Sequence, residues 1–208
     1  YSNHQNAFPE SSVSLLTTLS ANLGVALQNA RLFDETQRLL KETEQRAAEL
    51  AIINSVQQGL ASKLDMQAIY DLIGDKICEI FSLQTCFIMI YDRSAETEYY
   101  PYLVEDGTRL QQEPIAHDES GFGPHVMRTH QPIMINENMQ ARSAEVGSYN
   151  IGGSNWVKSA IYVPLLVGND AKGVISVQNT QREHAFTESD LRLLNTLASS
   201  MSVALENA

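Results

Sequence analysis

The side chains that could do chemistry in this sequence are few. Its two cysteines, Cys78 and Cys86, lack CxxC spacing and lie beside no metal-ligand pattern, so we expect free thiols and no metal site. The five histidines are His4, His117, His125, His130 and His184. The sequence contains no Ser-His-Asp order, nucleophile elbow or phosphate-binding glycine loop. We therefore assign no catalytic residue, expect no enzyme, and leave any cofactor unknown.

The composition narrows the possible partners. The net charge is −11, and the acidic residues are spread along the chain. A nucleic-acid site or an anionic membrane surface needs a basic patch, so we expect neither partner. No apolar run approaches the roughly 20 residues of a membrane span, and no signal peptide is present. We expect a cytoplasmic fragment of a longer protein, because the chain opens without Met and stops inside a repeated motif.

The chain ends as it begins. Residues 8–30 read FPESSVSLLTTLSANLGVALQNA, and residues 186–208 read FTESDLRLLNTLASSMSVALENA, each residue lying 178 positions before its counterpart. Such an internal repeat indicates that one complete unit follows the last helix of another. We predict three parts: residues 1–30 end a preceding domain, residues 31–50 are a linker helix, and residues 51–208 are a complete domain.

Residues 13–60 are predicted to form one long helix. Gly and Pro are absent between Arg31 and Gln58, and apolar residues recur at alternating spacings of three and four. Gln37 and Glu44 weaken this heptad seam. We predict a parallel two-stranded coiled coil, the alternative being a lone amphipathic helix packed on its own domain. The predicted homodimer interface comprises Leu16, Leu19, Leu23, Ala26, Ala30, Phe33, Leu40 and Ala47.

The remaining residues indicate an α+β domain built around one antiparallel sheet. Asp65 suits the N-cap of a helix, and Thr187 suits the cap of the last one. Pro101 moves its strand towards an edge of the sheet. Predicted helices cover residues 66–81, 122–129 and 188–208. Predicted strands cover residues 85–91 (central), 97–104, 132–136, 158–167 and 171–179. A long polar loop is expected over residues 137–156.

In combination, several stretches resemble a GAF domain over about residues 50–208. The stretches are GFGPHVMRTHQPIMIN (121–136), SAIYVPLLVGNDAKGVISVQN (159–179) and FTESDLRLLNTLA (186–198). One departure is His130, where the family often has Gly. The resemblance implies a GAF/PAS-like fold in which flanking helices cover a central antiparallel sheet. Similar domains in histidine kinases, cyclases, phosphodiesterases and transcription activators sense small molecules or dimerise, and most of them catalyse nothing.

The resemblance also implies a ligand pocket between the sheet and residues 121–156. A small-molecule site combines apolar walls with a few polar groups. For the aromatic residues the alternative is plain core packing. The candidate pocket residues are Phe87, Met89, Phe122, His125, Val126, Tyr149, Asn150, Trp156, Ser159 and Ile161.

Particular ligand classes of the family receive little support. Asn179, Phe186 and Asp190 match part of the NKFDE signature of cyclic-nucleotide-binding members, but Thr180 replaces its Lys and Leu191 its final Glu. A capping box formed by Thr187 and Asp190 explains what remains of the match. Neither cysteine lies where bilin attaches, and the 137–156 loop lacks the cysteines of the methionine-sulfoxide-reducing members. His125 is the best placed haem ligand, and a hydrogen-bonded or solvated histidine is the alternative.

The resulting prediction is a non-catalytic regulatory sensor of a multidomain signalling protein, such as a two-component histidine kinase. A small molecule would bind in the pocket, and a dimeric helical linker would relay the state to an output domain in the same chain. The alternative is a structural domain that pairs or spaces its neighbours and binds no ligand.

Overall fold

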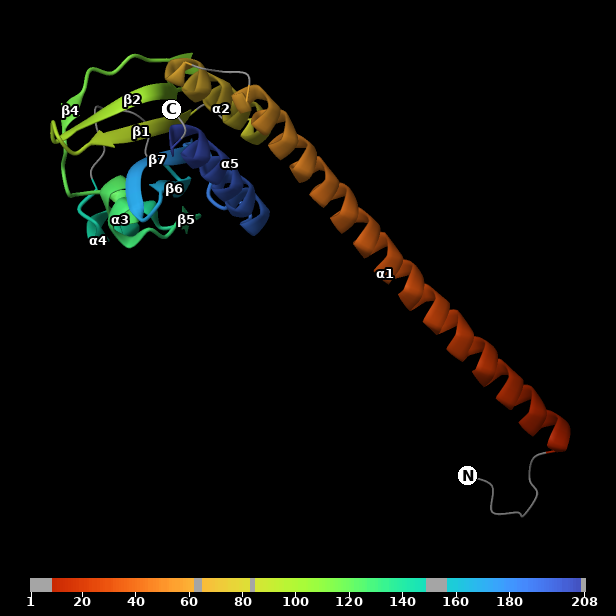
Figure 1. Ribbon diagram of the computed structural model, residues 1–208. Helices are drawn as coiled ribbons and strands as arrows, with labels where there is room; N and C mark the ends of the chain where they lie inside the picture. Colours follow the sequence, from red (N-terminus) through yellow and green to blue (C-terminus); the bar gives the residue numbers. More distant parts are fainter. Residues whose placement is uncertain (1–8, 62–64, 83–84, 149–156, 207–208) are drawn as a thin grey trace. The chain divides into compact units, whose positions relative to one another are not determined.

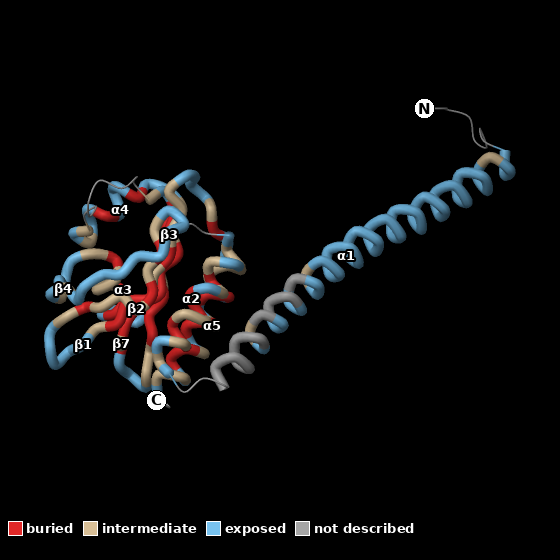
Figure 2. Tube along the Cα trace, turned by 90° about the horizontal axis from the view of Figure 1, so that it is seen from above, coloured by how far each residue is buried: buried red, intermediate tan, exposed pale blue. Residues whose placement is uncertain are grey.

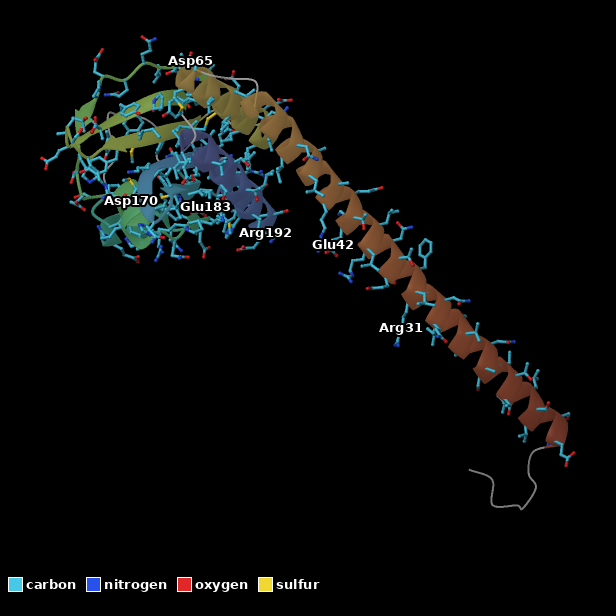
Figure 3. The ribbon with its side chains drawn as sticks, in the orientation of Figure 1. Arg31, Glu42, Asp65, Asp170, Glu183 and Arg192 are labelled. Atoms are coloured by element: carbon cyan, nitrogen blue, oxygen red, sulfur yellow. A yellow bond between two sulfur atoms is a disulfide. The ribbon has the colours of Figure 1, made fainter. Side chains whose placement is uncertain are left out.

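The computed structural model describes residues 9–61, 65–82, 85–148 and 157–206. The chain divides into two compact units, Tyr1–Leu50 and Ala51–Ala208. Helix α1 (Glu10–Ala61) makes up the first unit and continues into the second, which confirms the predicted long helix (Figure 1). Ion pairs with i,i+3 or i,i+4 spacing join Glu35, Arg38, Glu42 and Arg46 along its surface, and Figure 3 labels Glu42 among them.

The second unit is built on one antiparallel sheet, as predicted. Its order is β3-β2-β1-β7-β6-β5, with β4 also paired to β2, and β1 lies between β2 and β7. The described strands are β1 (Thr85–Asp92), β2 (Thr97–Glu105), β3 (Thr108–Arg109), β4 (Ile115–Ala116), β5 (Ile133–Ile135), β6 (Ser159–Val167) and β7 (Asp170–Asn179).

Four further helices belong to this unit in the described part of the chain. They are α2 (Met66–Phe81), α3 (Phe122–Thr129), α4 (Met139–Glu145) and α5 (Glu188–Glu206). Asp65 caps α2 by accepting a hydrogen bond from the Gln67 N–H at 3.2 Å (Figure 3). The α4 helix corrects the prediction of a continuous loop over 137–156, because the sequence MQARSAE contains good helix formers and Gly147 follows its end.

The sheet separates two buried cores because successive strand residues point to opposite faces. Cys86, Ile88 and Ile90 of β1 lie in the core that α2 and α5 cover. Phe87 and Met89, between them in sequence, pack in the core that includes α3 and α4. Figure 2 shows buried residues along the strands, α2 and α5, whereas most of α1 is exposed.

A β-bulge at Pro101 reverses this alternation in β2. Ile88 pairs with Tyr102 and Ile90 pairs with Tyr99, so β2 contains one extra residue between the two pairs. Tyr102 therefore faces α2, whereas Tyr100, two residues earlier, packs in the core on the α3 side of the sheet. Pro101 lies between the short pairings of β2 with β3 and β4, consistent with the predicted edge position.

The expectation of free thiols is wrong. Cys78 of α2 and Cys86 of β1 form a disulfide, with their Cα atoms 6.8 Å apart. The reason is the packing of two consecutive elements. Cys86 points into the core beneath α2, and Cys78 packs against the same core from the helix. The predicted cytoplasmic location therefore loses the support that reduced cysteines would give it.

Candidate functional site

A cavity of about 460 Å³ lies on the α3 and α4 side of the sheet. Its apolar wall includes Phe87 and Met89 from β1, Phe122 from α3, Met139 from α4 and Tyr162 from β6. Gly121, with a φ of +101°, allows the chain to turn sharply into α3, and its N–H donates to the Val146 carbonyl at 2.8 Å. This contact holds the start of α3 against the segment that follows α4.

Aromatic rings form a connected group at the cavity. Phe122 stacks on Tyr162 with ring centroids 5.2 Å apart. Phe87 meets Tyr162 edge to face at 6.4 Å and Tyr100 at 5.6 Å. These spacings fall in the favourable range for aromatic pairs, so the rings form a connected apolar wall.

A buried carboxylate interrupts this aromatic wall. Glu98 is only 6% exposed and borders the cavity. Its Oε1 lies 2.7 Å from His117 Nδ1, and its Oε2 accepts from the Tyr100 hydroxyl at 3.1 Å. An ionised carboxylate only accepts, so we assign the hydrogen to Nδ1. Tyr91 stacks on the His117 ring at 4.1 Å and fixes its orientation.

The cavity lining holds a second polar group, on β6 and β7. Gln178 Nε2 donates to the Tyr162 hydroxyl and to the Ser176 Oγ, each at 3.2 Å. Burial raises the pKa of Tyr162 to about 12, although the hydrogen bonds with Ser176 and Gln178 act in the opposite direction. Tyr162 is therefore a neutral phenol at physiological pH.

Three of the predicted pocket residues line the cavity: Phe87, Met89 and Phe122. His125 and Val126 belong to the same α3 helix but are absent from the described lining, and Val126 is completely buried. Without a place in the wall, His125 gains no support as a haem ligand. The predicted Tyr149, Asn150 and Trp156 lie outside the described residues.

Ser159 and Ile161, the last two predicted pocket residues, are not brought to the cavity. Ile161 is fully buried in the other core, under α2 and α5. The Ser159 Oγ donates to the Arg182 carbonyl at 3.0 Å and accepts from the Ala185 N–H at 3.3 Å. Ser159 therefore fixes the segment that leads into α5.

The partial NKFDE match consists of residues with structural roles. The Asn179 side chain accepts from the N–H groups of Gln181 and Arg182, each at 2.9 Å, and shapes a turn. Phe186 is buried in the core. Thr187 N–H donates to Asp190 at 2.7 Å, and Asp190 N–H donates to Thr187 Oγ1 at 3.3 Å, which is a capping box. These contacts account for the three residues without a nucleotide.

Sequence reasoning missed Glu98, Tyr100, Tyr162 and Gln178 of the cavity wall. Strand alternation could have found Tyr162, because it neighbours Ile161 and must face the other way. The same alternation misplaces Glu98, because the bulge at Pro101 lies between it and Tyr102.

Comparisons with known proteins agree with this architecture. The family profile described as "GAF domain" matches residues 63–206. No curated protein gives a significant match. The GAF domain of a phosphoenolpyruvate-protein phosphotransferase from Acinetobacter is similar at 17% identity, a TM-score of 0.64, and coverage of 77% of this chain and 94% of that one.

Two further solved structures share the fold. Free methionine-R-sulfoxide reductase from Neisseria meningitidis, in complex with its substrate, shows 18% identity and a TM-score of 0.62. The match covers 77% of this chain and 89% of that one. The GAF domain of a putative sensor histidine kinase from Pseudomonas syringae pv. tomato shows 14% identity and a TM-score of 0.54, and the match covers 80% of this chain and 91% of that one. Among the described helices, none is long and apolar enough to span a membrane.

Proposed function

Because the chain belongs to the GAF domain family, we propose that residues 51–208 are a non-catalytic sensor that binds a small molecule in the cavity beside α3. GAF domains are sensory or regulatory modules of signalling proteins, and some bind ligands. The observation that carries the proposal is the 460 Å³ cavity with aromatic walls and a buried carboxylate. A cavity of this size, with a few placed polar groups, suits a small ligand.

A structural domain that only pairs its neighbours is the competing function. Such a domain would fill its own pocket with side chains, whereas the described residues leave the cavity open. A catalytic function has less support. Cys78 and Cys86 form a disulfide in the core on the other face of the sheet, and the sequence of the 137–156 loop has no cysteine.

Native mass spectrometry tests the proposal. The mass of freshly purified protein under native conditions is compared with its mass after denaturation. Excess mass that denaturation releases is the expected result, and its value helps to identify the ligand. If no mass is released, and a broad metabolite extract produces no shift in melting temperature either, the structural function is favoured.

The sheet offers a physical connection between the cavity and the helices. Met89 borders the cavity, while Ile88 and Ile90 on either side of it pack under α2 and α5. A ligand that shifts Met89 therefore changes the surface on which these helices rest. We propose that the relay continues through α1 to an output domain of a two-component histidine kinase. Such a relay needs two states with different ligand affinities.

The eight predicted seam residues of α1 are all exposed in the chain. The internal repeat separates them into a first group inside the repeat, up to Ala30, and a second group in the linker. Leu16, Leu19 and Leu23 correspond to Leu194, Leu197 and Met201, each completely buried in α5. We propose that a preceding GAF-like domain, ending at residue 30, covers the first group in the parent protein. The homodimer seam then runs through the linker, residues 31–50.

Sedimentation equilibrium tests the linker seam. We expect a dimer at micromolar concentration, and monomer for Leu40→Glu, because a charge at a seam position must be desolvated. Leu39→Glu, an exposed leucine outside the seam in the same heptad, is the control and should leave the dimer intact. A monomeric wild-type chain at micromolar concentration would contradict the dimeric relay for this fragment. Replacing Gln37 and Glu44 with Leu should tighten the dimer and blunt regulation in the parent protein.

A further inference from the structure

We infer that the cavity binds a small organic cation, a protonated amine carried on an aromatic or aliphatic body. The inference depends on the proposed sensor function and specifies the chemical class of its ligand. It stands on three observations: the charges of the wall, the position of Glu98, and the arrangement of the aromatic rings.

The charges that border the cavity all have one sign. Glu98, Glu105, Asp106 and Asp118 contribute carboxylates, and the described lining includes no Lys, Arg or His. An anionic ligand would meet four like charges without a cationic partner, whereas an ammonium gains from each of them. The net charge of −11 adds to the attraction of cations over a longer range.

The N-terminus of α3 also borders the cavity, through Gly121, Phe122, Gly123 and Pro124. Helix N-termini attract anions through their free N–H groups. Here the Gly121 N–H already donates to the Val146 carbonyl, and Pro124 has no N–H. The N–H groups of Phe122 and Gly123 therefore remain as the donors of this first turn, two groups against the four carboxylates that border the cavity.

Glu98 has the geometry of an anchor for an ammonium group. It is 6% exposed, and each of its oxygens receives one hydrogen bond, from His117 and from Tyr100. A carboxylate has about four lone-pair sites, so both oxygens can accept again. Because its two partners hold it in one orientation, a bound amine pays little to order the side chain.

The rings of Phe87, Tyr100, Phe122 and Tyr162 provide the remaining surface for the ligand. They accommodate a flat apolar body, and their faces attract a nearby cation. Tyr162 is a phenol that is uncharged at neutral pH, so it acts through its ring and its hydroxyl. The exposed carboxylates of Asp106 and Asp118 lie at the rim and favour entry of a cation.

Three probes with one ring system test the inference: tryptamine (cation), tryptophol (neutral) and indole-3-propionate (anion). Their dissociation constants are measured by isothermal titration calorimetry at pH 7 on the whole chain, after removal of any retained ligand. We expect tryptamine to bind about tenfold more tightly than tryptophol, since a charged hydrogen bond contributes about that factor. Indole-3-propionate should bind most weakly.

Glu98→Gln keeps the shape of the anchor and should remove the preference for tryptamine over tryptophol. The matched control is Glu79→Gln, an exposed residue of α2 on the other side of the sheet, which should leave both constants unchanged. If Glu98→Gln does not fold, Asp118→Asn at the rim should reduce the preference more modestly. Two outcomes contradict the inferred ligand class while still agreeing with a sensor: indole-3-propionate binds most tightly, or the three probes bind equally. Binding of none, together with no mass released in the native spectrum, contradicts both.

Discussion

The beginning of α1 and the whole of α5 have similar sequences and opposite surroundings. Leu19 is 55% exposed, whereas its counterpart Leu197 is completely buried against the sheet. Leu15 and Leu193 differ in the same way, at 61% and 8%. The apolar pattern of a helix therefore shows which of its faces packs, but it does not reveal whether that face packs on a sheet or on a second helix.

Leucine truncation should separate the two helices most clearly. Leu197→Ala leaves a cavity in the core and should lower the free energy of unfolding by about 3 kcal/mol. Leu19→Ala removes an exposed side chain and should cost less than about 0.5 kcal/mol. Urea denaturation followed by circular dichroism measures both. A large, concentration-dependent cost for Leu19→Ala would show instead that this stretch forms part of a dimer seam.

Glycine substitution should give effects of opposite sign in two helices. An added Cβ at Gly74 of α2 would overlap the ring of Tyr102, so Gly74→Ala should destabilise the domain by about 2 kcal/mol. Gly24 of α1 has open space around it, and Gly24→Ala should stabilise its helix by about 1 kcal/mol. Thermal denaturation of the two variants measures the contrast. A neutral Gly74→Ala would mean that the Tyr102 ring moves aside without cost.

Helices α1 and α5 also differ in how their first turns are capped. Thr187 and Asp190 form the capping box of α5, while the repeat places Pro9 and Ser12 at the start of α1. Asp190→Ala should cost about 1 kcal/mol, because the Thr187 N–H loses its acceptor. Hydrogen exchange at the first turn of α5 should accelerate accordingly. Ser12→Ala is the matched control in α1, and equal acceleration there would remove the distinction.

Ser202 of α5, the counterpart of the exposed Gly24, should give an effect as small as that of Asp190 and of opposite sign. Its Oγ is the one buried side-chain oxygen without a hydrogen-bond partner in the described part of the chain. Ser202→Ala removes this unpaired hydroxyl and should stabilise the domain by about 1 kcal/mol. Ser199→Ala, at an exposed position where the Oγ donates to the Asn195 carbonyl at 2.9 Å, is the comparison: it gives the same change in helix propensity and loses a hydrogen bond. A higher melting temperature for Ser199→Ala than for Ser202→Ala would contradict the expectation.

Local patterns in the sequence were sufficient to predict much of the domain. The Asp65 and Thr187 caps, the central strand β1 and the unbroken α1 follow from residue types and spacing that act within a few positions. The α4 helix was missed because its seven residues are too few to show a clear apolar period. The disulfide was missed because its two cysteines meet only when α2 packs on β1.

The candidate site was harder to predict than the fold. Phe87 and Met89 follow from the alternation of β1, but Glu98 does not follow from that of β2. Strict alternation from Val104 and Tyr102 would place Glu98 under α2, and the extra residue at the bulge returns it to the cavity. No local signal distinguishes such a bulge from a regular strand containing Pro101.

The bulged edge of β2 also limits how copies of this protein can associate. A free sheet edge accepts a foreign strand through its unpaired N–H and C=O groups. Pro101 offers no N–H there, and its carbonyl already accepts from Gln67 at 2.9 Å and from Arg109 at 2.8 Å. The neighbouring Leu103 carbonyl accepts from the Leu110 N–H. A foreign strand therefore finds few free N–H and C=O groups along this stretch of β2.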